Sequence, residues 1–125
     1  EEEERARTFF KGICESGPEI LASGGSATLA GITQRLHGGI DIVYLICHGS
    51  VREGVPRLML EKEDGSIDFA EAAALVQTVR DVDTPPGLVV LASCQSAGSG
   101  ASADALVALG PQLAAAGVPA VVAMQ

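Results

Sequence analysis

The sequence predicts an α/β domain with a mostly parallel sheet and helices on both faces. Three apolar runs of strand length occupy residues 41–48, 88–93 and 118–124. Two segments with apolar residues at helical spacing, 69–79 and 103–116, separate these runs. Continuous apolar strands are typical of parallel sheets, which are covered on both faces, and helices between successive strands supply the crossovers of parallel pairing. We therefore expect the order strand, helix, strand, helix, strand.

The N-terminal part is predicted to add a helix, a short strand and a second helix. Residues 1–14 are expected to be helical because three apolar side chains fall on one helix face, those of Phe9, Phe10 and Ile13. Residues 19–22 are short enough to form one strand before a glycine turn. A helix is predicted over 27–36, with Ser26 as its N-cap and the glycine pair 38–39 as its stop.

The middle of the chain is predicted to hold a short hairpin and then a helix. Residues 58–60 alternate weakly, and 63–66 carry turn residues, so Ile67 is expected to lead away on the other side. Ser66 or Asp68 is expected to cap the helix over 69–79. Its inward side chains are predicted to be Phe69, Ala72, Leu75, Val76 and Val79.

The last third of the chain is predicted to be a glycine-rich loop, a helix and a strand. The loop is expected over 95–102 and the helix over 103–116, with a kink or a second start at Pro111 and an end at Gly117. The length of 125 residues is that of one domain, so residues 1–125 are predicted to form a single unit.

Composition excludes several classes of partner. The formal net charge of −8 would repel a phosphate backbone, so no nucleic acid is expected. No apolar run approaches the roughly 20 residues that span a bilayer, so no membrane segment is expected. The three cysteines, Cys14, Cys47 and Cys94, fit neither a disulfide framework nor a zinc site. We interpret them as reduced thiols in the cytoplasm, and expect no metal and no cofactor.

Two chemically reactive residues follow two of the apolar runs. His48 comes at the end of 41–48, and Cys94 directly follows 88–93. The carboxyl ends of neighbouring parallel strands share one edge, so these side chains are expected to meet there. A thiol is a strong nucleophile, and an imidazole can accept its proton and pass one to a leaving amine. The pair therefore predicts nucleophilic catalysis by Cys94 with His48 as acid and base.

The backbone N–H groups of Gly49 and Cys94 are predicted to form an oxyanion hole, because a residue without Cβ allows close approach of a substrate carbonyl. Cys47 is expected to be structural, since it points to the opposite face from His48. His37 is interpreted as a helix-end residue favoured by the negative end of the helix dipole.

Three blocks of the sequence resemble a CHAT domain, a caspase-like peptidase domain often attached to tetratricopeptide repeats. The blocks are residues 44–50 (YLICHGS), 91–97 (LASCQSA) and 108–125 (ALGPQLAAAGVPAVVAMQ). The resemblance implies a caspase-haemoglobinase-like three-layer fold, a Cys/His dyad of Cys94 and His48, and Gly49 as the oxyanion glycine. It also implies a protein or peptide substrate, and repeat or sensor regions of the same full-length protein as partners.

The sequence departs from relatives of the family in two ways. Ala92 stands where metacaspases carry an aspartate, and the caspase pentapeptide around the nucleophile is absent, so neither an acidic nor a basic primary-specificity pocket is predicted. Family members continue beyond the strand ending at Gln125, so we expect this chain to be a domain core that is incomplete at its C-terminus.

Two other functions compete with that of a cysteine endopeptidase. A catalytically inactive caspase-like module would serve docking or regulation. A small nucleotide-binding α/β domain would use Gly24-Gly25 or Gly98-Ser99-Gly100 before a helix, where free N–H groups attract anions. The second loop lacks the third glycine of the dinucleotide fingerprint, and no Walker lysine follows either loop.

Overall fold

The computed structural model describes residues 4–5, 7–8, 25, 27–92 and 100–124 of the chain. Its elements are α2 (Leu29–His37), β1 (Ile42–Ile46), β2 (Gly49–Arg52), β3 (Val55–Glu61), β4 (Ile67–Glu71), α3 (Ala72–Asp81), β5 (Leu88–Ala92), α4 (Gly100–Ala115) and β6 (Ala120–Met124). Glu4, Arg5, Arg7 and Thr8 are helical, as predicted for 1–14. The predicted strand at 19–22 and the predicted cap Ser26 lie outside the described residues.

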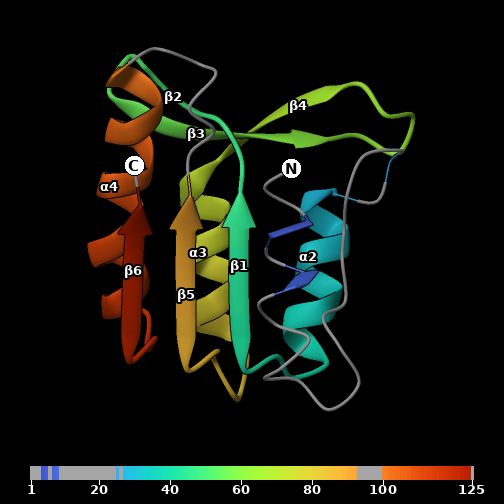
Figure 1. Ribbon diagram of the computed structural model, residues 1–125, viewed down its shortest axis with the longest axis vertical. Helices are drawn as coiled ribbons and strands as arrows, with labels where there is room; N and C mark the ends of the chain where they lie inside the picture. Colours follow the sequence, from blue (N-terminus) through green and yellow to red (C-terminus); the bar gives the residue numbers. More distant parts are fainter. Residues whose placement is uncertain (1–3, 6, 9–24, 26, 93–99, 125) are drawn as a thin grey trace.

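The three predicted apolar strands form one parallel sheet in the order β1, β5, β6 (Figure 1). Ile42 lies opposite Leu88, and Leu88 lies opposite Ala120, so all three strands begin at the same level. β5 is the central strand, and its Leu91 is fully buried. The prediction of a parallel α/β sheet is confirmed.

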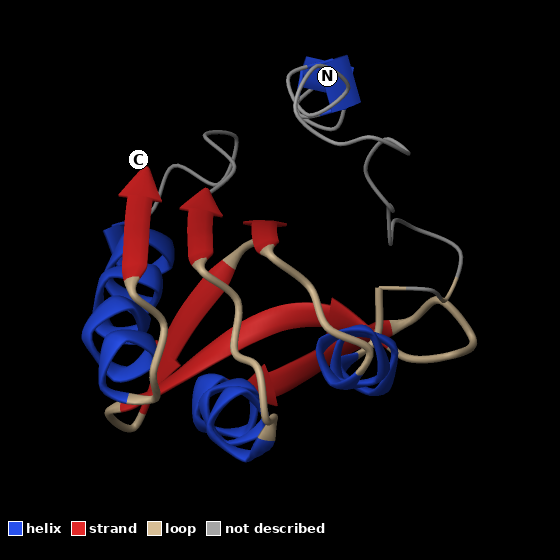
Figure 2. Cartoon of the chain, turned by 90° about the horizontal axis from the view of Figure 1, so that it is seen from below, coloured by secondary structure: helices blue, strands red, loops and turns tan. Residues whose placement is uncertain are grey.

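Helices α2, α3 and α4 all lie on the same face of the parallel sheet (Figure 2). These three helices cover one face only, while the described helical residues at the N-terminus, 4–5 and 7–8, lie on the other side of the sheet (Figure 2). The strand order explains the positions of α3 and α4, which connect β1 to β5 and β5 to β6: the chain advances in one direction along the sheet, and right-handed crossovers made in one direction place their helices on one side. Alternate residues of the strands therefore remain uncovered by them, and Val122 is 46% exposed. β1 is half-buried along its whole length rather than fully buried.

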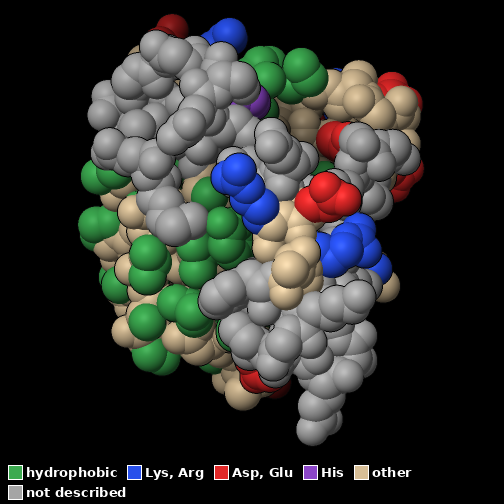
Figure 3. All heavy atoms as spheres, viewed as in Figure 1, with side chains coloured by type: hydrophobic (Ala, Val, Ile, Leu, Met, Phe, Trp, Pro, Cys, Tyr) green, Lys and Arg blue, Asp and Glu red, His purple; other side chains and the backbone are tan. Residues whose placement is uncertain are grey.

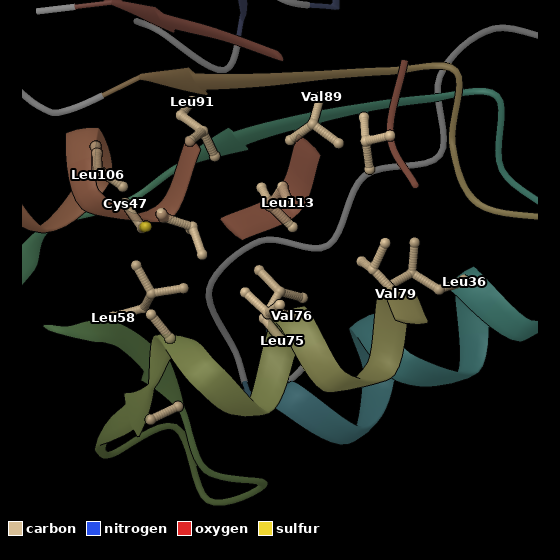
Figure 4. Packing of buried hydrophobic residues seen from close by; sticks show 14 of the residues in the cluster. Leu36, Cys47, Leu58, Leu75, Val76, Val79, Val89, Leu91, Leu106 and Leu113 are labelled. Atoms are coloured by element: carbon tan, nitrogen blue, oxygen red, sulfur yellow. The ribbon is translucent and has the colours of Figure 1, made fainter. Parts of the chain in front are cut away.

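The core lies between the parallel sheet and these helices. Figure 4 shows Val89 and Leu91 of β5 pointing toward the helices, where side chains of α3 and α4 meet them. The largest fully buried side chains are Leu58, Leu91, Leu106, Leu109, Leu113, Val79 and Pro86. Aliphatic residues account for nearly all of this core, as expected of a chain with 3% aromatic residues.

A second, antiparallel sheet in the order β2, β3, β4 lies at the carboxyl end of the parallel sheet (Figure 1). Only the β3–β4 hairpin was predicted. The β2–β3 connection is the two-residue loop Glu53-Gly54, with φ of 53° and 78°, as a type I′ turn requires. Leu58, Leu60 and Ala70 face inward and are buried, so this sheet contributes one face to the core.

The predicted start of the helix at residue 69 is wrong. Residues 67–71 form β4, and Phe69 lies opposite Met59 and is 38% exposed instead of pointing inward. α3 begins at Ala72, after Glu71, which makes no side-chain cap bond. Successive side chains of a strand point to opposite faces, and in β4 this places Ala70 inward. Pairing of residues 67–71 with β3 therefore decides their structure, although the apolar residues from Phe69 onward also have helical spacing. The other inward side chains are as predicted, namely Ala72, Leu75, Val76 and Val79.

The turn between β3 and β4 has the predicted chemistry. Asp64 accepts hydrogen bonds from Ser66 Oγ at 2.6 Å and Ser66 N at 2.9 Å. The side-chain bond from Ser66 is the main reason that the pKa of Asp64 lies below its usual value. Ser66 is therefore engaged in the turn and does not cap a helix.

Two helix boundaries also differ from prediction. Thr28, not Ser26, caps α2, because its Oγ1 accepts from Gly31 N at 2.9 Å. α4 begins at Gly100, three residues before the predicted start, and runs past Pro111 to Ala115. Gly117 follows with φ of 115°, which is the predicted glycine stop.

The carboxylate of Glu61, at the end of β3, binds the backbone of the residues just before α2. Its Oε2 accepts from Gly25 N at 3.0 Å and from Ala27 N at 3.2 Å. Replacing Glu61 by alanine removes two charge-assisted hydrogen bonds and is expected to cost about 1–3 kcal/mol of unfolding free energy. Urea denaturation measures this. Glu63→Ala, at an exposed neighbouring carboxylate, is the matched control, and equal effects of the two changes would contradict the role of Glu61.

Candidate active site at the carboxyl end of the parallel sheet

His48 lies at the junction of the two sheets. The backbone N–H of Cys47, one residue past β1, donates to the carbonyl of Ala92 at 3.3 Å and so continues the parallel pairing with β5. The carbonyl of His48 accepts from Met59 N at 2.9 Å, at the start of the antiparallel ladder. The backbone just before His48 is thus hydrogen-bonded to the parallel sheet, and the carbonyl of His48 is hydrogen-bonded to the antiparallel sheet. These two bonds fix the position of the His48 backbone.

The imidazole of His48 is half-buried, and its Nδ1 atom is buried without a hydrogen-bond partner among the described residues. A buried nitrogen with no partner costs about 1–3 kcal/mol. Such atoms are rare, and each one calls for a functional or structural explanation.

Gly49 is the first residue of β2 and is buried, opposite Leu58. It directly follows His48, so the predicted base and the predicted oxyanion glycine lie side by side. Cys94 lies outside the described residues. β5 ends at Ala92, two residues before it in sequence.

Sequence comparison identifies the family to which this arrangement belongs. The CHAT domain family matches residues 1–125, which is the whole chain. The chain is a CHAT domain. The family is caspase-like, which agrees with a histidine-glycine pair after the half-buried parallel strand β1. Neither a curated protein nor a solved structure gives a significant match.

Two other predicted residues of this CHAT domain lie where expected. Cys47 is 8% exposed and belongs to the hydrophobic core (Figure 4). His37 is exposed in the last turn of α2. Cys47 directly precedes His48, but its side chain belongs to the core, and His37 lies in α2.

The glycine loops of the nucleotide-binding alternative fall almost wholly outside the described residues; only Gly25 and Gly100 are described. In the parts of the chain that the structure describes, no group of three metal-ligating side chains occurs, and no helix is long and apolar enough to cross a membrane.

Two polar residues that sequence reasoning missed lie near His48 in the CHAT domain. Ser50 and Arg57 are directly opposite each other on β2 and β3, so their side chains share one face of the antiparallel sheet. Within the described residues, Ser50 Oγ and Arg57 Nε are buried and have no hydrogen-bond partner. The Glu53-Gly54 pair could have indicated the β2–β3 hairpin from the sequence. It predicts a two-residue turn less strongly than the preferred pairs Asn-Gly and Asp-Gly.

Proposed function

We propose that this CHAT domain is a cysteine endopeptidase core in which Cys94 is the nucleophile and His48 the acid and base. The proposed substrate is a protein or peptide, and the proposed fold is the caspase-haemoglobinase fold. Repeat or sensor regions of the same full-length protein are the proposed partners, and the cytoplasm, where thiols stay reduced, is the proposed location.

The register between β1 and β5 carries the proposal. Each residue of β1 pairs with the β5 residue 46 positions later, from Ile42 with Leu88 to Ile46 with Ala92. His48 and Cys94 are separated by the same 46 positions, so each follows the last pair of this ladder by two residues. The family match supports the same assignment, and so does the Nδ1 of His48, which has no hydrogen-bond partner in the part of the chain that the structure describes.

In the proposed reaction, His48 accepts the thiol proton of Cys94 and the sulfur attacks the peptide carbonyl carbon. The N–H groups of Gly49 and Cys94 stabilise the resulting oxyanion. The C–N bond breaks as the imidazolium gives its proton to the leaving amine, which leaves a thioester on Cys94. Water, deprotonated by His48, then hydrolyses the thioester and regenerates the thiol.

Thiol reactivity tests the proposal without knowledge of the substrate. Near neutral pH, iodoacetamide is expected to alkylate Cys94 at least about tenfold faster than Cys14 or Cys47, because a neighbouring imidazole raises the thiolate fraction. Mass spectrometry of each cysteine-containing peptide measures the three rates. His48→Ala is expected to remove the excess reactivity of Cys94, whereas His37→Ala leaves it unchanged. A Cys94 that reacts no faster than the other two would favour the inactive docking module.

A further inference from the structure

The face of the antiparallel sheet that points away from the helices is hollowed. A depression of about 590 Å³ is lined by Arg52, Glu53, Val55, Arg57 and Phe69, which come from β2, the β2–β3 turn, β3 and β4. Leu58 and Ala70 point to the opposite, buried face of these strands. The depression is therefore a surface feature, separate from the core.

Two guanidinium groups are positioned in this depression. The guanidinium of Arg52 lies 5.1 Å from the centre of the Phe69 ring, a cation–π distance. Arg57 lies 3.7 Å from the carboxylate of Glu71 and donates to the carbonyl of Phe69 at 3.5 Å. Both distances are long and Glu71 is half-exposed, so this pairing is weak. The Nε atom of Arg57 is buried and has no partner among the described residues.

The lining of the depression holds two arginines and one glutamate, whereas acidic residues outnumber basic ones in the chain as a whole. The chain has 16 acidic and 8 basic residues, yet two arginines meet at one depression. A ligand that both arginines bind is an anion, and a carboxylate matches the fork of a guanidinium. Among the described residues that line the depression, Glu53 at the β2–β3 turn, with φ of 53°, carries the acidic side chain, and it opposes such a ligand.

The surroundings favour a peptide as the carrier of that carboxylate. Phe69 and Ile67, both on β4, are 38% and 54% exposed, so an apolar surface adjoins the arginines. In the described part of the chain, β4 pairs with β3 alone, so this apolar surface lies at the edge of the sheet. Arg57 and Ser50 continue the same sheet face toward His48.

We propose that this face of the antiparallel sheet binds an extended acidic peptide segment. A peptide carboxylate contacts Arg52 and Arg57, and a neighbouring apolar side chain packs on Phe69. The site is a docking surface and not the pocket for the residue at the cleaved bond. Binding requires no chemistry at Cys94, so it goes beyond the peptidase proposal and is tested independently of it.

Fluorescence anisotropy of a labelled peptide that alternates Glu with Val tests this proposal. The chain is expected to bind it more tightly than the same peptide with Gln for Glu, and 0.5 M NaCl is expected to weaken the binding. Arg52→Gln and Arg57→Ala are each expected to lower the affinity about five- to tenfold, the loss of one charge-assisted contact. Glu53→Gln is expected to raise it about twofold, because a repelling charge is removed.

Arg80→Ala, at an exposed arginine in the last turn of α3, is the matched control and is expected to leave the affinity unchanged. Circular dichroism verifies folding, and Arg52→Gln and Glu53→Gln decide the outcome if Arg57→Ala fails to fold. Equal affinity for the Glu and Gln peptides would overturn the proposal. So would an affinity that Arg52→Gln and Glu53→Gln leave unchanged, or that Arg80→Ala lowers as much as Arg52→Gln does.

Discussion

Replacing Cys94 by alanine is expected to abolish peptide-bond cleavage while leaving the domain folded. Alanine offers no nucleophile, and no other group in the proposed reaction can form the thioester. His48→Ala is expected to lower the cleavage rate by about 10²- to 10⁴-fold, the usual contribution of a general acid and base. Cleavage of a mixed library of quenched fluorescent peptides measures both effects, with products identified by mass spectrometry.

Matched variants separate this chemical effect from loss of structure. Cys47→Ala removes a thiol that lies in the core, and His37→Ala removes an exposed imidazole at the end of α2. Both are expected to keep the cleavage activity of folded protein, although Cys47→Ala unfolds at a lower temperature. Wild-type cleavage by Cys94→Ala would exclude Cys94 as the nucleophile, and a CHAT domain with no cleavage in any form would favour the docking module.

The parallel sheet was predictable because its signal is local. Each of its strands is a run of apolar residues, and α3 (Ala72–Asp81) shows its buried face at helical spacing. The side of the sheet on which the helices lie was not predictable from these runs. It depends on the strand order, and no residue pattern within one strand specifies which strand lies next to it.

The antiparallel sheet was largely missed because its strands are short and mixed. β2 has four residues, Gly49–Arg52, and a buried glycine starts it, so no alternation of apolar and polar residues is visible. Residues 67–71 fit both a strand and the first turn of a helix, and pairing with β3 decides between them.

The same contrast applies to the candidate site. His48 and Gly49 could be proposed as site residues from the sequence because they follow an apolar run, and one strand end is enough to indicate them. Ser50 and Arg57 could not, because their shared face arises from a cross-strand pair seven positions apart in sequence. Features that arise from pairing between strands could be found only in the structure. The depression at Arg52 is one of them.

Leu91→Ala is expected to give the largest loss of stability of any change considered for this domain, about 2–5 kcal/mol of unfolding free energy. Leu91 is 0% exposed on the central strand β5 and points toward the helices (Figure 4). Truncation removes its buried methyl groups and leaves a cavity that flanking strands on both sides prevent from closing. The total free energy of unfolding of a small domain is about 5–15 kcal/mol, so the variant loses a large share of its stability.

The control is Val122→Ala on the adjacent strand β6. The Val122 side chain is 46% exposed and lies on the face of the sheet opposite the helices. Figure 3 shows the hydrophobic side chains on this face. Val122→Ala removes apolar atoms from the same sheet without opening a core cavity, so the loss is expected to stay below about 1 kcal/mol. The midpoints and slopes of urea denaturation give both values. Equal losses would mean that β5 is no better buried than β6, which would contradict the strand order on which the proposed pairing of His48 with Cys94 depends.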